Sequence, residues 1–381
     1  MGSVISMWMV VLILLLFHHT LVVSGNTLLA MPFSEESKNS AIEAYNNAFY
    51  NKDSNLVGYY CVNTAKRGKP GRGNFWTTCE QIEALEDAAK RSSPMKTVYQ
   101  GMITELVNGL NQIVSGTPHW HSWNMFNDDI MWGVIALVRG YELTGKTNQE
   151  FLHQAQVQFN EVWRRGFDDS LGGGLWWKYN DPVKTKNACV NFPAIIAAMY
   201  LARNTVNTGF RSQAEQLWKW SRENLYNETT GRVSDHKKSD GKLDTKSYTY
   251  NQGTFIGAAY MLYLHTRNKG YLADCRLAAS FAMKHLTTKS KGVDILDNNE
   301  GNGNDGPGFK GIFARWCSKY AKKADDETMK EWLCANAEMA WKNRNRETKL
   351  MGTKWQDPTP HNRELTSWEC SSGLSITQNA P

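Results

Sequence analysis

Asn127-Asp128-Asp129-Ile130-Met131-Trp132 places two adjacent carboxylates at the start of a predicted helix whose next turns are apolar. Asp and Asn are good N-cap residues, and the helix dipole favours negative charge in the first turn, so one aspartate has a structural explanation. Consecutive helical residues point about 100° apart, so both carboxylates cannot serve the same cap. We therefore expect one of them to be available for chemistry.

The residues leading into this stretch, His119-Trp120-His121-Ser122-Trp123-Asn124-Met125-Phe126, are rich in aromatic and polar rings. Such a composition fits a sugar-binding cleft better than a solvated loop. The alternative is that these rings pack in the core, which is the more frequent use of Trp in proteins. The same two interpretations apply to the fifteen Trp of the whole chain.

Apolar periodicity along the rest of the chain predicts helices and no convincing strand alternation. The predicted helices lie at about 36–52, 75–91, 94–114, 127–144, 147–165, 187–204, 209–226, 247–267, 270–287, 308–323, 326–344 and 364–376.

Short and long connections alternate between these helices. Tight turns are predicted at 92–93, 145–146, 205–208, 268–269 and 324–325. The long loops are 53–74, 115–126, 166–186, 227–246, 288–307 and 345–363, and they are rich in Gly, Asp, Asn, Lys and Trp. Helical hairpins stacked side by side would place all short turns at one end and all long loops at the other. We predict an all-α (α/α)6 barrel of six helical hairpins.

Four of the helices that follow long loops contain small or apolar residues nearly all round, which predicts that they form an inner ring. They are 127–144, 187–204, 247–267 and 308–323. Four helices that follow short turns have one charged and one apolar face and should form the outer wall. They are 147–165, 209–226, 270–287 and 326–344. The aspartate pair then lies at the loop-rich mouth of the barrel, where function is expected.

The apolar run at 9–17, followed by Val22, Val23, Ser24 and Gly25, has the form of a signal peptide. A membrane span needs about 20 apolar residues, and His18-His19-Thr20 interrupts the run too early. We expect residues 1–25 to be a signal peptide and 26–381 a single catalytic domain with no membrane attachment after cleavage. The protein would be secreted to the extracellular space or cell wall, where Asn227-Glu228-Thr229 is a glycosylation sequon.

Seven cysteines are an odd number for an oxidising compartment, so at least one thiol should stay free. Cys61 and Cys79 bracket a Gly-rich loop and are the favoured disulfide pair, although spacing does not prove connectivity. No CxxC or His-Cys cluster indicates zinc, and we expect no metal and no cofactor. The net charge of +6 is scattered along the chain, which disfavours nucleic acid as a partner. We expect a monomer.

Several motifs in the long loops and inner helices are candidate substrate contacts. Gly172-Gly173-Gly174-Leu175-Trp176-Trp177 is either a binding loop or a tight structural turn, and it lacks the features of a phosphate cradle. Lys310 and Arg315 could face solvent, which is the default for basic residues. The predicted substrate-binding residues are Trp123, Trp176, Trp177, Asn191, Tyr250, Asn251 and Lys310, which the barrel would bring around Asp128 and Asp129.

Taken in order, these motifs resemble family 76 of the glycoside hydrolases across about residues 36–370. The resemblance rests on Asn127–Trp132, the Gly-Gly-Gly-Leu-Trp-Trp loop, Lys186-Asn187-Ala188 with Asn191, Tyr250–Gly253 with Ile256-Gly257-Ala258, and Phe309-Lys310-Gly311. It implies a six-hairpin (α/α)6 barrel that acts on α-1,6-mannan with retention. It also implies that Asp128 is the nucleophile and Asp129 the acid/base.

The resulting hypothesis is a secreted retaining glycoside hydrolase that cleaves an α-linked, mannan-type polysaccharide substrate internally, by double displacement. A cell-wall transglycosidase is one alternative, because a sugar hydroxyl can intercept the glycosyl-enzyme in place of water. A catalytically silent glycan-binding protein is another. The presence of both acids favours an enzyme, since retaining glycosidases need two carboxyl groups.

Overall fold

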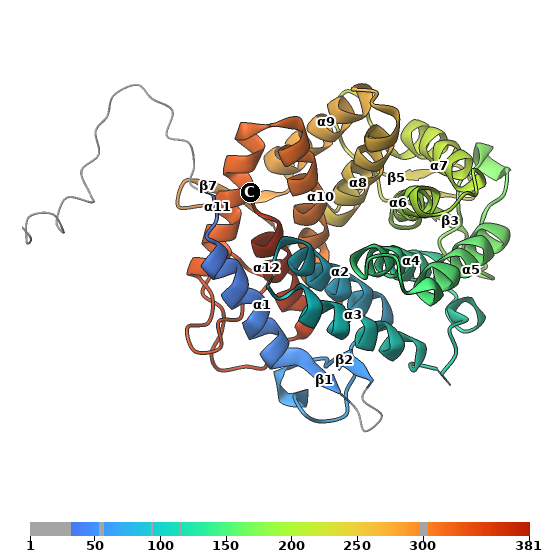
Figure 1. The fold of residues 1–381 in the computed structure, drawn as a ribbon. Coiled ribbons are helices and arrows are strands. Elements are labelled where there is room, and N and C mark those ends of the chain that lie inside the picture. The colour runs from blue at the N-terminus through green and yellow to red at the C-terminus, as the bar shows by residue number, and fades with distance from the viewer. Residues whose placement is uncertain (1–31, 53–56, 93, 115, 298–303) are drawn as a thin grey trace, which may run out of the picture. The chain divides into compact units, whose positions relative to one another are not determined.

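Alternating inner and outer helices organise the part of the chain that the computed structural model describes, which is residues 32–52, 57–92, 94–114, 116–297 and 304–381. The predicted signal peptide, residues 1–25, lies outside the described residues. Twelve α-helices occur in the described part (Figure 1), each within a few residues of its predicted bounds. They are α1 (Glu35–Phe49), α2 (Phe75–Arg91), α3 (Lys96–Asn111), α4 (Asn127–Leu143), α5 (Gln149–Gly166), α6 (Ala188–Asn204), α7 (Gly209–Leu225), α8 (Thr249–Thr266), α9 (Gly270–His285), α10 (Phe309–Ala324), α11 (Glu327–Lys342) and α12 (Ser367–Asn379).

Six helices form the inner ring of the barrel. α2, α4, α6, α8, α10 and α12 lie side by side in this order, and α12 lies beside α2, so the ring closes (Figure 1). The outer helices α3, α5, α7, α9 and α11 each pack against the inner helix that precedes them in the chain. The predicted (α/α)6 barrel is confirmed, and α2 and α12 complete the ring begun by the four helices predicted to be inner.

The sixth hairpin is assembled from the first and last helices. α1 packs on α12, which is the last inner helix. Phe33 N donates to Pro381 O over 3.1 Å, and Tyr45 Oη donates to Ser367 O over 2.9 Å. The barrel is therefore closed by contacts between the two ends of the described chain.

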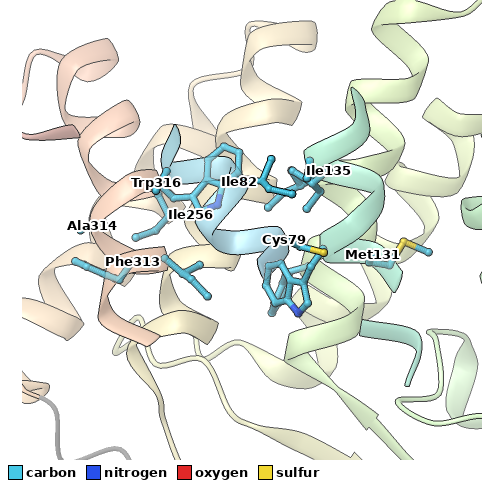
Figure 2. Close-up of a cluster of buried hydrophobic side chains, with 14 of the residues drawn as sticks. Cys79, Ile82, Met131, Ile135, Ile256, Phe313, Ala314 and Trp316 are labelled. Carbon is cyan, nitrogen blue, oxygen red and sulfur yellow. The ribbon is translucent and has the colours of Figure 1, made fainter. Parts of the chain in front are cut away.

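Apolar side chains fill the space between the inner helices (Figure 2). Ile82 of α2 and Ile256 of α8 are fully buried, and Trp316 of α10 is almost so. Gly257 lets α8 and α10 approach closely, because a Cβ atom at this position would lie 2.6 Å from the Trp316 ring. The small residues of the predicted inner helices thus permit close helix packing.

Short β-strands occur in and beside the long loops, where the sequence shows no alternation of apolar and polar residues. β3 (Thr185–Asn187), β4 (His236–Lys238) and β5 (Leu243–Asp244) form one antiparallel sheet. The other strands form two antiparallel pairs, β1 (Tyr50–Lys52) with β2 (Gly58–Tyr60) and β6 (Thr287–Ser290) with β7 (Val293–Leu296). Each strand has only two to four residues, which is too short for a period of two to be visible in sequence.

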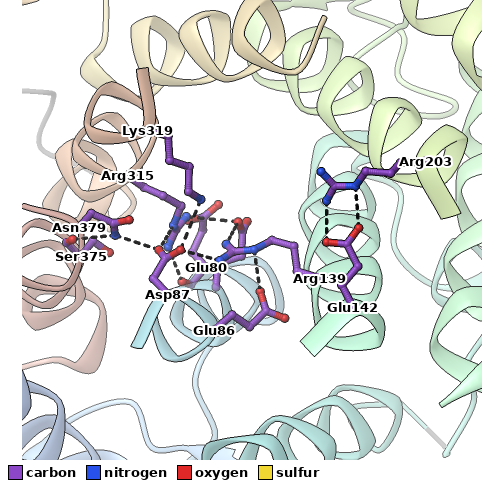
Figure 3. Close-up of polar contacts among 11 residues, drawn as sticks. Glu80, Glu86, Asp87, Arg139, Glu142, Arg203, Arg315, Lys319, Ser375 and Asn379 are labelled. Carbon is purple, nitrogen blue, oxygen red and sulfur yellow. Dashed lines mark hydrogen bonds and ion pairs between the residues drawn. The ribbon is translucent and has the colours of Figure 1, made fainter. Parts of the chain in front are cut away.

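A cluster of charged side chains is buried inside the ring (Figure 3). Arg315 of α10 is fully buried, so the expectation that it faces solvent is wrong. Its Nε lies 2.8 Å from Asp87 Oδ2, and the same aspartate lies 2.6 Å from Arg139 of α4. Burial alone would raise the pKa of Asp87, but Arg139, Lys319 and Arg315 hold it well below its usual range. These opposite charges explain why basic residues are found inside the barrel.

The expected disulfide between Cys61 and Cys79 is absent from the described residues, which include all seven cysteines. Every cysteine is a buried free thiol. The Cys61 Sγ lies 3.3 Å from Asn63 O, whereas Cys79 lies inside α2 and points into the ring core (Figure 2). The two residues bracket a loop in sequence, and each is buried in the hydrophobic core as a free thiol. Within the described residues, no helix has the length and apolar content needed to cross a membrane.

Candidate active site

A cleft of about 740 Å³ lies at the end of the barrel where the inner helices begin. The first turns of five inner helices contribute Trp76, Asp128, Cys189, Tyr250 and Phe309 to its wall. The long loops supply most of the other lining residues, as expected if function lies on the loop face of a rigid scaffold. Residues far apart in the sequence therefore meet in one cleft.

Neither aspartate of the adjacent pair caps the helix that it opens. α4 begins at Asn127, and its N-cap residue is Phe126, which makes no side-chain capping bond. Asp128 and Asp129 lie in the first turn, and both are half-buried in the wall of the cleft. The helix dipole stabilises negative charge at this end of α4. Both carboxylates are thus free of a capping role.

Asp128 has the environment of a carboxylate that ionises near neutral pH. Burial raises its pKa to about 6, and hydrogen bonding from Cys189 and Trp177 opposes this effect. Its Oδ1 atom is buried and has no hydrogen-bond partner among the described residues. An ionised carboxylate in the wall of a cleft can attack an electrophilic carbon.

Asp129 has the environment of a carboxyl group that keeps its proton. Burial and the charge of Asp128 raise its pKa well above the usual range, and Asp305 adds to this effect. A hydrogen bond of 3.0 Å from Asn124 Nδ2 to Asp129 Oδ2 opposes it. Two neighbouring carboxyl groups in different environments can divide acid and nucleophile roles between them.

Arg165 of α5 holds the loop that leads into the pair. Its Nη1 donates to His121 O over 2.7 Å, and its Nη2 donates to Asn124 O over 2.9 Å. Its Nε donates to Asn127 Oδ1 over 2.8 Å, and Asn127 Nδ2 in turn donates to Trp176 O. One guanidinium group therefore fixes the approach to the first turn of α4 at three points.

Aromatic rings form much of the cleft surface around the aspartates. Tyr250 stacks on Phe309 with ring centroids 3.9 Å apart, and the ring centroids of Trp177 and Phe126 lie 5.2 Å apart. Trp76 is fixed by a 3.2 Å bond from its Nε1 to Asp305 Oδ1. A few polar groups among aromatic walls are typical of sites that bind organic ligands.

Four of the predicted site residues line the cleft, namely Asp128, Asp129, Trp177 and Tyr250. The remaining ones lie outside its lining and hold the surrounding structure.

Trp123, Trp176 and Lys310 have structural partners. Trp123 packs edge-on against Phe75 with ring centroids 5.3 Å apart. Trp176 Nε1 donates to Asp168 Oδ2 over 2.6 Å. Lys310 is only 1% exposed, and its Nζ donates to Leu296 O over 3.1 Å. Its ammonium group therefore holds a loop, in contrast to the predicted contact with substrate.

The two predicted asparagines also bond to protein groups. Asn191 Oδ1 accepts from Leu175 N over 2.7 Å, and Asn191 Nδ2 donates to Leu175 O over 3.1 Å, which fixes the Gly-rich loop against α6. Asn251 Nδ2 donates to Asp235 Oδ1 over 3.0 Å, and Asp235 itself lines the cleft. Asn251 does not line the cleft but is hydrogen-bonded to a residue that does.

Polar residues of the long loops also line the cleft, and they were not among the predicted site residues. Asp235 and His236 lie in the loop before α8, joined by a 2.8 Å contact between His236 Nδ1 and Asp235 Oδ2. Asp305 lies just before α10. Their position in loops at the mouth was the available signal. Among the described residues, no three His, Cys, Asp or Glu side chains are grouped as a metal site.

Comparisons with known proteins agree with this geometry. The model of glycosyl hydrolase family 76 matches residues 36–380. A mannan endo-1,6-alpha-mannosidase of Candida albicans is 26% identical over 291 residues, which cover 72% of this chain and 61% of that protein. One from Saccharomyces cerevisiae is 30% identical over 164 residues, covering 38% of this chain and 36% of that protein. The chain thus matches less than two thirds of the length of these relatives.

Among solved structures, the chain resembles the GH76A alpha-1,6-mannanase from Salegentibacter sp. HEL1_6. The TM-score is 0.78 with 28% sequence identity, and the match covers 91% of this chain and 98% of that one. An inactive variant of that enzyme, with two consecutive aspartates replaced by asparagine, has been solved in complex with alpha-1,6-mannotriose.

Proposed function

The chain belongs to glycosyl hydrolase family 76, and from this membership we propose that it cleaves α-1,6-linked mannan internally with retention of configuration. Asp128 would act as the nucleophile and Asp129 as the acid/base. The observation that carries the proposal is the adjacent, uncapped carboxyl pair in the wall of an aromatic cleft.

Double displacement assigns one task to each carboxyl group. In the first step, Asp129 gives its proton to the glycosidic oxygen while Asp128 attacks the anomeric carbon, and the C–O bond to the leaving sugar breaks. A covalent glycosyl-Asp128 intermediate remains. In the second step, Asp129 takes a proton from water, whose oxygen displaces Asp128 and restores the original anomeric configuration.

The environments of the two groups support this division. With a pKa of about 6, Asp128 is ionised at neutral pH, which is the form that attacks carbon, and burial together with the Asp128 charge keeps Asp129 protonated. The substrate class is supported by the similarity to the Candida albicans mannan endo-1,6-alpha-mannosidase and the Salegentibacter alpha-1,6-mannanase.

Secretion is also part of the proposal. The apolar run at 9–17 has the form of a signal peptide, and the sequon at Asn227 is exposed on the loop after α7. A secreted chain would meet its polysaccharide outside the cell or in the cell wall.

The test is incubation of the purified protein with α-1,6-mannan, with product lengths and anomeric configuration followed by NMR. Asp128→Asn and Asp129→Asn should each lower the rate by at least about a hundredfold. Asp240→Asn, which removes an exposed carboxylate outside the cleft, should leave the rate unchanged. Full activity in both cleft variants would reject the assignment.

The same experiment separates the alternatives. Products longer than the substrate would indicate a cell-wall transglycosidase, because a sugar hydroxyl then replaces water in the second step. Binding of mannan without any product would indicate a silent glycan-binding protein.

A further inference from the structure

Asn124 makes a direct side-chain contact with the proposed acid/base residue. Its Nδ2 lies 3.0 Å from Asp129 Oδ2, and the asparagine is only 5% exposed. Among the described residues, no other side chain donates a hydrogen bond to Asp129. The two oxygens of this carboxyl group therefore have different surroundings.

The orientation of the Asn124 amide is fixed by a second hydrogen bond. Its Oδ1 accepts from Phe126 N over 2.9 Å, so the NH₂ group must be the end that faces Asp129. A flipped amide would place its carbonyl oxygen against the carboxyl oxygen and its NH₂ group against a backbone N–H. Arg165 holds the backbone of Asn124 through Asn124 O, which fixes the loop as well as the side chain.

We propose that Asn124 is a positioning residue that confines the transferable proton of Asp129 to Oδ1. The inference rests on the proposed role of Asp129 as acid/base. In a carboxylic acid the carbonyl oxygen is a better hydrogen-bond acceptor than the hydroxyl oxygen, so the amide donor favours Oδ2 as the carbonyl oxygen. The proton then sits on Oδ1, which delivers it to the glycosidic oxygen and later removes one from water.

The same hydrogen bond keeps this proton transferable. Burial and Asp128 both raise the pKa of Asp129, and the Asn124 donor is the effect that opposes them. Without the donor, the protonated form would be favoured further and proton release would become harder. Asn124 thus acts on both the location of the proton and its acidity.

The test compares pH profiles of variants on two substrates. Asn124→Ala removes the whole amide, and Asn124→Leu removes the donor while keeping a side chain of similar size. In both, the alkaline limb of kcat should move up by about one pH unit, and hydrolysis of α-1,6-mannan at neutral pH should fall about tenfold. Hydrolysis of a dinitrophenyl α-1,6-mannobioside should fall less than about threefold, since its leaving group departs without protonation.

Ser122→Ala is the matched control, because Ser122 Oγ bonds to His119 O in the same loop and does not contact Asp129. Its pH profile should equal that of the unmodified protein. An unchanged alkaline limb in both Asn124 variants, or equal losses on the two substrates, would overturn the inference and leave Asn124 a structural residue. Failure of the proposed function is distinguishable, since the unmodified protein would then release no product from mannan. Failure of the acid/base assignment alone would leave Asp129→Asn active.

Discussion

Asn251 Nδ2 lies 3.0 Å from Asp235 Oδ1, so a fully buried amide of α8 holds a carboxylate that lines the cleft. The other oxygen of that carboxylate contacts His236. Asn251 therefore influences the site through Asp235 and does not line the cleft itself.

Replacement of Asn251 should have a moderate effect on catalysis. Asn251→Ala removes one buried hydrogen bond to a charged group, for which a loss of about tenfold in kcat/KM on α-1,6-mannan is expected. Asp128→Asn measured in parallel should lose far more. A larger loss from Asn251 than from Asp128 would mean that the catalytic group has been misidentified.

Activity should show a bell-shaped dependence on pH. In the proposed mechanism Asp128 attacks in its ionised form, so kcat/KM should fall as the pH drops through about 6. Asp129 must be protonated, so kcat/KM should fall again as the pH rises through its raised pKa. Asp305→Asn removes a charge that raises the pKa of Asp129, and its alkaline limb should therefore move to lower pH. An upward movement would contradict this electrostatic description.

Loss of a buried arginine should destabilise the barrel strongly. Arg315→Met leaves Asp87 and Glu80 inside the ring with less compensating charge, and should lower the free energy of unfolding by about 3–5 kcal/mol in urea denaturation. Arg203→Met is the matched control, since Arg203 pairs with Glu142 at the surface (Figure 3). It should cost at most about 1 kcal/mol. Equal losses in the free energy of unfolding for the two variants would show that Arg315 is not needed to compensate the buried carboxylates.

The Gly-rich loop should be sensitive at Gly174. Its φ is +86°, and an added Cβ would lie 2.5 Å from the Trp220 ring. Gly241 has a φ of +85° but no neighbour within 4 Å of a Cβ. Alanine is strained by the backbone at both positions, so the difference isolates the steric clash. Gly174→Ala should be less stable than Gly241→Ala by about 1–3 kcal/mol, measured by urea denaturation.

Sequence patterns predicted the fold because four of the six inner helices carry a local signature. The helix at 187–204, for example, is apolar nearly all round and follows a long Gly-rich loop, and the structure places α6 at Ala188–Asn204 in the inner ring. The charged residues of α2 had no such signature. Glu80 and Asp87 would normally mark an exposed helix face, and only their pairing with Arg315 and Arg139 across the ring makes their burial possible.

The site was predicted less completely because side-chain direction depends on the rotation of each helix. Tyr250 and Asn251 are neighbours, yet Tyr250 faces the cleft and Asn251 faces a loop, as expected for residues about 100° apart on a helix. Polar groups at the start of an inner helix can bind either substrate or the loop above them. Asn191 and Lys310 do the latter.

Because α1 packs on α12, the arrangement of the helices does not depend on which helix comes first in the chain. Phe33 and Pro381 are joined by a backbone hydrogen bond of 3.1 Å, so a short peptide can link these two residues without moving either helix. A circularly permuted chain with new ends in the exposed connection at 206–208, between α6 and α7, would keep every inner helix beside its present neighbours. The order in which the helices are synthesised would change, while the arrangement of the carboxyl pair in its cleft would stay the same.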